Sequence, residues 1–484
     1  MRKLWLLLAL LLLLSGCGKA PAEVQQPEPQ LVVIDLYAVN DLHGRLTDNE
    51  TQPGVDELTT YLKQQTGNKI LLSTGDMWQG TMESSLTGGA IITQWMNHLD
   101  FNAMILGGHE YDWGEDLIRQ NLAQANFPFL AINVYSRDTD RRADYCQASV
   151  LVEVDGVQIG IIGAIGDCYA GIAAEHTREV YFKTGPELTE LVKAEAQNLR
   201  SQGADFIVYA VHDGAAVTTD DTKAQPVDDQ TLQSYYDTEL SNGFVDLVFE
   251  ADTHYRYVLQ DQYGVYHLQG GANSSGIAHA KVVIDRARGI SSVMLAELLP
   301  AGKYSYLEDD PIVAQLLEQY GEQLAPGNRV LGSNKQYRSG AMICQLVANL
   351  YCTKGEETWG DYDIVLGGGY ISCRAPGYLP VGEVTYSQLQ SLLPFDNKIT
   401  LCSIRGRDLL SKFLETNNDA YYMKLSDFGK SIRDSIDPNG LYYVVTDSYT
   451  ADYAYNHLTV VATYDERVFA RDLVADYFAA EDLE

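Results

Sequence analysis

The sequence predicts an α/β protein, and three observations support this fold class. Five apolar runs rich in β-branched residues each end in a polar cluster, at residues 31–39, 69–74, 103–106, 205–211 and 246–249. Amphipathic stretches at residues 54–65 and 188–202 have helical spacing and lie between those runs. The chain has 484 residues, enough for more than one domain at roughly 100–200 residues each. Strands that alternate with helices predict a layered domain whose sheet is covered on both faces.

The composition is that of a globular protein with a strongly acidic surface. Hydrophobic residues make up 46% of the chain and charged residues 21%, and the formal net charge is -32. Such a charge repels nucleic acid backbones and anionic lipid, so a nucleic acid polymer is not expected as a partner. A phosphate-bearing substrate would need a local positive centre, which a bound metal supplies. The simpler interpretation is that the charge only keeps the protein soluble.

The N-terminus has the pattern of an export signal. Two basic residues precede an apolar run at 4–14, which is too short for a membrane-spanning helix of about 20 residues. Leu14-Ser15-Gly16-Cys17 resembles a bacterial lipobox, so we expect residues 1–17 to be a lipoprotein signal peptide with Cys17 as the lipidated residue. Residues 18–30, rich in Pro, Gln, Ala and Glu, are expected to be a tether. The alternative is a plain secretory signal with a chance cysteine.

Six further cysteines leave the redox chemistry open. None has a CxxC spacing, so the spacing does not predict a cysteine metal site. An oxidising exterior permits disulfides between Cys146 and Cys168 and among the remaining four, and buried thiols are the alternative. The six are Cys146, Cys168, Cys344, Cys352, Cys373 and Cys402.

The pattern changes near residue 305, after strand-like segments at 280–284 and 293–298. We therefore predict one domain at 31–305 and another at 306–484, joined by a bridging helix at 309–324. Further predicted elements are helices at 339–351 and 406–415 and strands at 363–366, 397–405, 441–446 and 458–463.

Acidic and histidine side chains follow the apolar runs where the predicted strands end. In α/β sheets, binding sites form beyond the carboxyl ends of the strands. Phosphate ester hydrolysis needs a nucleophile at neutral pH and neutralised phosphoryl oxygens, and two metals about 3.5–4 Å apart supply both. Taken singly, such an Asp is more often a cap and such a His is more often structural, but their joint placement favours a metal site. The residues are Asp41, His43, Asp76, His109, His212, Asp252 and His254.

These clusters resemble the motifs of the calcineurin-like metallophosphoesterases, and among them the bacterial 5'-nucleotidases, UDP-sugar hydrolases and 2',3'-cyclic-nucleotide phosphodiesterases. The NDxHG, GDxxxGS, GNHExD, HxG and GHxH motifs have counterparts, in order, at 40–44, 75–81, 107–112, 212–214 and 251–254. The resemblance implies a four-layer α/β/β/α sandwich followed by a second α/β domain that binds nucleotide. It also implies two divalent metal ions, Mn²⁺, Zn²⁺ or Mg²⁺.

The resemblance assigns a role to each position. The implied ligands are Asp41, His43 and His254 for the first metal, Asp76 as a bridge, and His212 with Asp252 for the second. His109, oriented by Asp112, would stabilise the phosphoryl oxygens or protonate the leaving group.

Two residues depart from the family's motifs, and both lie at the second metal. Gly108 replaces an Asn, so one oxygen ligand is absent, and Asp252 replaces a His. An oxygen ligand at 252 shifts the preference toward harder ions such as Mn²⁺ or Mg²⁺. The missing ligand is replaced by water or by another side chain, or the second site is weakened.

The second domain resembles the family's nucleotide-binding domain. Gly368 and Gly369 stand in a glycine-rich loop, and Phe395 belongs to a Pro-Phe-Asp-Asn segment that supplies a base-stacking aromatic. Tyr453 or Tyr455 is the implied second platform, and such stacking contributes about 1–3 kcal/mol per base. The alternative is that these aromatics are core or ordinary surface residues and that the glycines form a tight turn.

The sequence therefore predicts an extracytoplasmic, membrane-anchored lipoprotein that hydrolyses phosphate esters, above all nucleotides. A catalytically impaired nucleotide-binding protein on the same lipid anchor is the alternative. Gly108 and Asp252 favour the alternative, whereas the retained pair of His109 and Asp112 favours the enzyme.

Overall fold

The structure is a computed structural model that describes residues 28–48, 53–172, 176–215, 232–233, 235–369, 373–374, 376–414, 424–426, 432–453, 457–464 and 468–481. The expected signal peptide with Cys17, most of the tether, and Tyr455 lie outside the described residues. No helix within these ranges is long and apolar enough to cross a bilayer.

A six-stranded sheet begins the fold. Its central strand β1 (Leu31–Val39) pairs in parallel with β2 (Asn68–Ser73), and β2 pairs in parallel with β3 (Ala103–Ile105). The order β14-β13-β1-β2-β3-β4 is completed by β4 (Phe129–Leu130), β13 (Gly276–Asp285) and β14 (Ile290–Pro300).

A second six-stranded sheet faces the first. Four of its strands, β12, β10, β9 and β7, are parallel neighbours. The order is β11 (Arg256–Gln260), β12 (Tyr266–Gly270), β10 (Leu247–Phe249), β9 (Phe206–His212), β7 (Val157–Ile165) and β6 (Ser149–Val154). A separate pair is formed by β5 (Val134–Ser136) and β8 (Val180–Phe182).

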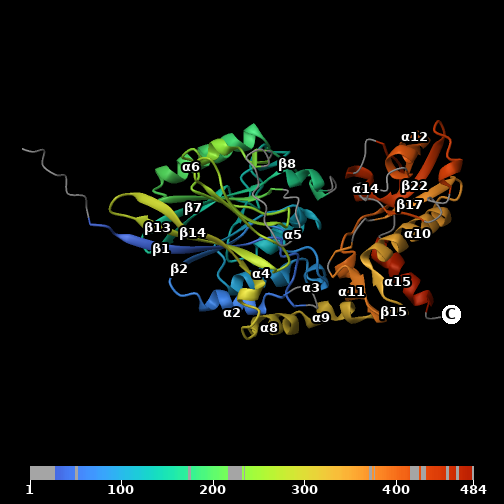
Figure 1. The fold of residues 1–484 in the computed structure, drawn as a ribbon, viewed down its shortest axis with the longest axis horizontal. Helices are drawn as coiled ribbons and strands as arrows, with labels where there is room; N and C mark the ends of the chain where they lie inside the picture. The colour runs from blue at the N-terminus through green and yellow to red at the C-terminus, as the bar shows by residue number, and fades with distance from the viewer. Residues whose placement is uncertain are drawn as a thin grey trace, which may run out of the picture.

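The two sheets pack face to face, and helices cover their outer faces (Figure 1). Ile34 and Leu36 of β1 and Val208 of β9 are fully buried in the core between the sheets. This burial on both faces explains why the parallel strands are nearly continuous apolar runs. The first sheet is covered by α2 (Asp56–Gln64), α3 (Met82–Leu86), α4 (Ala90–His98), α5 (Glu115–Leu122) and α8 (Ile312–Gln319), and the second by α6 (Pro186–Ser201). The four-layer α/β/β/α sandwich implied by the resemblance is confirmed.

A second body follows in the chain (Figure 1, orange to red). Its five-stranded sheet has the order β21 (Lys424–Leu425), β17 (Ile364–Gly369), β22 (Leu441–Asp447), β20 (Ile399–Arg405) and β23 (Thr459–Thr463). Around the sheet lie α10 (Gly340–Thr358), α11 (Tyr386–Leu392), α14 (Ser448–Tyr453) and α15 (Ala470–Glu481). Two short pairs join β15 (Val330–Asn334) to β19 (Gly382–Thr385) and β16 (Arg338–Ser339) to β18 (Tyr378–Leu379).

The structure corrects two sequence-based expectations. The predicted helix at 309–324 is broken into α8 and α9 (Gly321–Leu324), because Tyr320 leaves the helical conformation at φ -92 and ψ 8. The glycines at 367–369 end strand β17 instead of forming a turn. Gly367 is needed there because α10 packs so closely that a Cβ would run into the carbonyl of Ala348. Tyr453, one of the two residues implied as a second base platform, ends the helix α14.

No disulfide bond joins cysteines among the described residues. The Sγ atoms of Cys344 and Cys373 lie 3.6 Å apart, and Cys146 and Cys168 donate to separate carbonyl groups. The pairing of Cys146 with Cys168, left open by the sequence, is absent.

Candidate metal centre

The loops that follow β1 and β2 bind each other through backbone hydrogen bonds. Asp41 N donates to Gly75 O and His43 N donates to Asp76 O, both at 3.0 Å. Asp41, His43 and Asp76 have φ angles of 49°, 51° and 54°, in the left-handed region that non-glycine residues rarely adopt. Asp252 and His254, at the end of β10, share this conformation at 68° and 62°. The backbone thus turns sharply at five of the predicted ligands.

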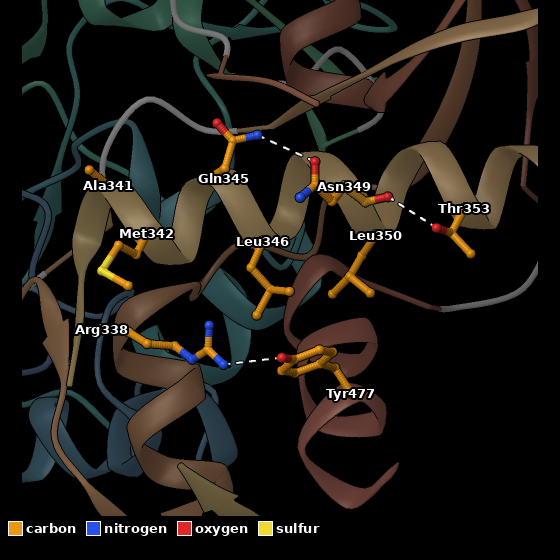
Figure 2. Close-up of a pocket in the computed structure, with 9 residues that line it drawn as sticks. All are labelled: Arg338, Ala341, Met342, Gln345, Leu346, Asn349, Leu350, Thr353 and Tyr477. Carbon is orange, nitrogen blue, oxygen red and sulfur yellow. Dashed lines mark hydrogen bonds between the residues drawn. The ribbon is translucent and has the colours of Figure 1, made fainter. Parts of the chain in front are cut away.

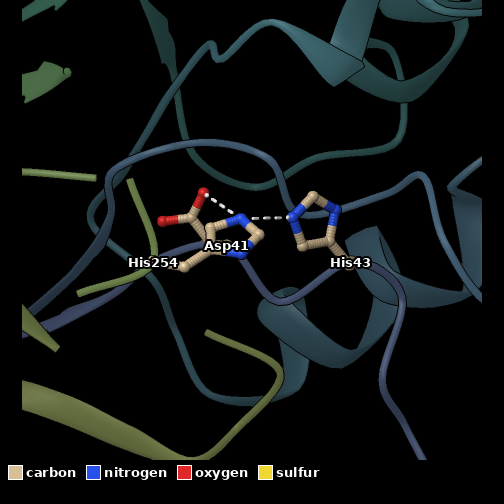
Figure 3. A group of neighbouring side chains, drawn as sticks. All are labelled: Asp41, His43 and His254. Carbon is tan, nitrogen blue, oxygen red and sulfur yellow. Dashed lines mark hydrogen bonds and ion pairs between the residues drawn. The ribbon is translucent and has the colours of Figure 1, made fainter. Parts of the chain in front are cut away.

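Asp41, His43 and His254 form the first ligand group (Figure 3). His43 Nε2 lies 3.0 Å from His254 Nε2, and His254 Nε2 lies 3.4 Å from Asp41 Oδ1. His43 Nδ1 contacts Gln79 O at 3.0 Å, which leaves Nε2 to face the group. Burial and the neighbouring His254 ring hold the pKa of His43 well below its usual range. A neutral imidazole whose lone pair meets a second imidazole and a carboxylate fits a divalent cation.

His212 and Asp76 form the second group together with Asp41. His212 is fully buried, and its Nδ1 contacts Thr74 O at 2.6 Å. Its Nε2 lies 3.2 Å from Asp76 Oδ1 and 4.0 Å from Asp252 Oδ1, yet makes no hydrogen bond. A buried ring nitrogen aimed at two carboxylates without a hydrogen bond is the arrangement expected of a metal ligand. Asp76 also groups with His43 and His109, so it is close to residues of both groups.

His109 and Asp112 lie beside these groups at the end of β3. His109 Nδ1 is 2.8 Å from Asp112 Oδ2, and His109 Nε2 is 4.0 Å from Asp76 Oδ2. Burial by itself lowers the pKa of His109, but Asp112 and then Asp76 outweigh burial and raise the pKa to about 9. A protonated imidazole next to the ligands is suited to donate to a phosphoryl or leaving-group oxygen.

Glu110 organises the site, and the sequence reasoning missed it. Its carboxylate is fully buried and accepts hydrogen bonds from the backbone N–H groups of Asp76, Met77 and Gly107, at 2.9, 2.8 and 2.7 Å. These bonds join the loop after β2 to the loop after β3. The only signal in the sequence is the position of Glu110 within the 107–112 motif.

Asn40 supports the first group in a similar way. Its Nδ2 donates to Asp41 Oδ2 at 2.7 Å and to Gly271 O, and its Oδ1 accepts from Gly270 N at 3.1 Å. Asp41 is thereby oriented by a buried amide that lies one residue away in the sequence.

Residues of the second body reach His109. Arg374 Nη2 lies 3.4 Å from His109 Nε2, and the Phe395 ring stacks on the His109 ring with centroids 5.6 Å apart. The Arg374 guanidinium lies 5.3 Å from the centroid of Phe395. Phe395 and Arg374 therefore lie at the edge of the candidate metal centre where His109 stands.

The structure describes only some of the other predicted substrate residues, and Tyr455 lies outside the described ranges. Gly368 and Gly369 pair with Leu425 and Lys424 of β21, and the side chain of Tyr453 is outside what the structure describes. A pocket of about 570 Å³ is lined by residues of α10 together with Arg338 and Tyr477, which are hydrogen-bonded to each other (Figure 2). None of its lining residues is a predicted ligand, so we do not assign the chemistry to it.

Comparison with known proteins agrees with this geometry. No family model matches the chain. The 5'-nucleotidase of Diplobatis ommata is 24% identical over 417 residues, which are 78% of this chain and 70% of that protein. Protein UshA of Yersinia enterocolitica is 23% identical over 480 residues, which are 86% of this chain and 85% of that protein.

Among solved structures, the 5'-nucleotidase precursor of Thermus thermophilus superposes with a TM-score of 0.70 at 18% identity, covering 94% of this chain and 97% of that one. A likeness of this extent shows a shared two-domain α/β fold. Together with the acidic and histidine side chains that gather at the strand ends, the sequence matches show that the chain is a phosphoric ester hydrolase that is similar to the 5'-nucleotidase metallophosphoesterases.

Proposed function

We propose that the protein removes phosphate from nucleotides or related phosphate esters, with His109 as the acid–base group. The observation that carries the proposal is the pair of His109 and Asp112, which lies 4.0 Å from the carboxylate of Asp76 between the two ligand groups. When bound, two divalent cations supply Lewis acidity toward phosphoryl oxygens and lower the pKa of water.

The ligand assignment is part of the proposal. Asp41, His43 and His254 hold the first ion, Asp76 bridges, and His212 with Asp252 holds the second. The convergence of their ligand atoms within 4.8 Å in overlapping groups supports this assignment. Metal binding also offsets the repulsion that three carboxylates impose on one another in so small a volume.

The protein's own residues position and protonate the substrate. Asp112 holds His109 with Nε2 turned to the ligand groups, and Arg374 beside it adds a fixed positive charge for a phosphoryl oxygen. Phe395, which stacks on His109, is placed for a base to lie against it once the two rings part. The similarity to proteins named 5'-nucleotidase supports a nucleotide as the substrate class.

We further propose that the enzyme works outside the cytoplasm, attached to the membrane by a lipid on Cys17. The basic start, the apolar run at 4–14 and Ser15-Gly16-Cys17 support this location. Globomycin-sensitive processing and metabolic labelling with a fatty acid, lost in Cys17→Ser, would test it.

Phosphate release tests the activity. Purified protein would be assayed with AMP, a UDP-sugar and a 2',3'-cyclic nucleotide, with added Mn²⁺ or Zn²⁺ and with EDTA. We expect metal-dependent release from at least one ester, abolished by EDTA and by His109→Ala. Release that survives EDTA contradicts the metal mechanism.

The second candidate is a binding protein that has lost turnover, and Gly108 favours it because that position supplies no ligand. Measurable nucleotide binding by calorimetry without release from any of the three esters would establish this candidate and overturn the enzyme.

A further inference from the structure

We propose that Cys168 is a ligand of the second metal ion, on the side of the site where Gly108 offers no side chain. The inference deepens the proposed function, because it rests on two divalent ions at this centre. The spacing of the cysteines in the sequence provided no reason to expect a sulfur ligand.

The topology brings Cys168 to the metal centre. Strand β7 is the parallel neighbour of β9, and Ile165 at its carboxyl end pairs with His212. Gly166 N then donates to His212 O at 3.0 Å, and Asp167 N donates to Asp213 Oδ2 at 2.7 Å. Cys168 follows directly, in the short 3-10 helix η2 (Asp167–Gly171). The carboxyl end of β7 is thus one more strand end at the same edge as the ligands.

The donor atoms are close enough to share one ion. Cys168 Sγ, a ring nitrogen of His212 and a carboxylate oxygen of Asp252 all lie within 4.8 Å of one another. His212 Nε2, fully buried and without a hydrogen bond, is the independent sign that a ligand belongs here. Cys168 Sγ also donates to His212 O at 3.3 Å, which keeps the sulfur beside that ring.

The space beside Gly108 is open toward the residue that follows η2. A Cβ built on Gly108 meets only Ile172 Cγ1, at 3.9 Å, and Ile172 directly follows η2. The backbone at Gly108 has φ -65 and ψ -45, a conformation open to any residue. Glycine is therefore not required there by the backbone, and a larger side chain at this position would have room.

The chemistry of binding is a proton exchange without any redox step. The S–H bond of Cys168 breaks, a sulfur–metal bond forms, and the proton leaves to solvent. The second ion then has oxygen donors from Asp76 and Asp252, a nitrogen from His212 and a sulfur from Cys168. A thiolate favours Zn²⁺ or Co²⁺, and so reverses the preference for harder ions that Asp252 alone implied.

Cobalt substitution tests the sulfur–metal bond directly. Metal-free full-length protein would be titrated with Co²⁺ and followed by near-ultraviolet absorption, where a thiolate bound to Co²⁺ gives a charge-transfer band. We expect the band in the wild-type protein and in the control Cys146→Ser, a half-buried cysteine whose Sγ donates to Ala131 O. We expect Cys168→Ser to lose the band and to bind the second equivalent of Co²⁺ about tenfold to a hundredfold more weakly by equilibrium dialysis.

Serine keeps a hydroxyl donor for His212 O, so the variant retains the hydrogen bond that the thiol makes in the wild type. If Cys168 had only this structural role, the wild-type protein would not show the charge-transfer band. In Cys168→Ala, the added change Gly108→Asn should restore the second equivalent without the band, because an amide oxygen then takes the place of sulfur. Three results would overturn the inference. The wild-type protein could bind two equivalents of Co²⁺ without the band, the band could persist in Cys168→Ser, or the wild-type protein could fail to bind a second equivalent. Loss of the band in Cys168→Ser without phosphate release from any ester supports the ligand and refutes only the proposed reaction.

Discussion

Asp112 offers the sharpest test of the acid–base assignment. Asp112→Ala removes the carboxylate that lies 2.8 Å from His109 Nδ1, and Asp112→Asn keeps an acceptor oxygen but removes the charge. A hydrogen bond to a charged group contributes about 1.5–3 kcal/mol, which at 1.36 kcal/mol per decade is about 10–150-fold in rate. We expect Asp112→Ala to lose this full factor in kcat on AMP and Asp112→Asn to lose a smaller part.

The substrate decides whether the loss is one of acid catalysis. An ester with a good leaving group, such as p-nitrophenyl phosphate, needs little protonation of its leaving oxygen, so its kcat should fall much less than that of AMP. Asp116→Asn is the matched control, because Asp116 lies in the following helix with its side chain 88% exposed. Equal losses on both substrates, or an Asp112→Ala variant within twofold of wild type on AMP, would refute the reasoning.

Three further predictions concern Glu110, His267 and Phe395. Glu110→Ala leaves three backbone N–H groups without their acceptor, each worth about 1–3 kcal/mol, so urea unfolding should show a loss of at least about 3 kcal/mol, and an unchanged midpoint contradicts this. Burial alone lowers the pKa of His267, but Glu250 outweighs it and raises the pKa to about 9. Since this folded-state pKa lies above the unfolded value of about 6.5, the stabilisation is full below about pH 6.5 and disappears as pH rises through about 9. It amounts to about 3 kcal/mol, and His267→Gln should flatten the dependence of unfolding free energy on pH between about 6.5 and 9.5. Phe395→Ala should raise KM about 5–150-fold for AMP but not for glycerol phosphate, and equal changes for both would exclude a base platform.

The strand-end reasoning predicted that the acidic and histidine side chains come together, because parallel strands bring their carboxyl ends to one edge of the sheet. That rule alone was enough to predict the location of Asp41, His43, Asp76, His212 and His254. The role of Glu110 could be found only from the folded loops. A carboxylate that accepts hydrogen bonds from three backbone amides of two loops has no signature in a linear motif. Sheet topology thus determines which strand ends lie together, whereas the packing of the loops determines which side chains support them.

Two other features were out of reach for definite physical reasons. The run that forms β7 was not counted among the predicted strands, and with it the end of β7 and Cys168 were missed. The stacking of Phe395 on His109 joins residues 286 positions apart in the chain and depends on how the second body meets the first. No local sequence pattern indicates this contact. In addition, the segment between the bodies was predicted as one continuous helix, whereas it forms the two helices α8 and α9.

The backbone conformation of the predicted ligands explains why so many hydrogen bonds surround them. These residues lie in the left-handed region. Five predicted ligands have positive φ angles, and at about 1 kcal/mol each their cost is about 5 kcal/mol, a sizeable share of the roughly 5–15 kcal/mol by which a domain is usually stable. Such a conformation persists only where neighbouring groups enforce it. Here Asp41 N and His43 N bind the loop after β2, Asp252 N donates to both carboxylate oxygens of Asp41, and Glu110 holds Asp76 from behind. Because these bonds are made by backbone groups and a buried acid, the ligands are held in position before a cation binds, and binding does not have to order them.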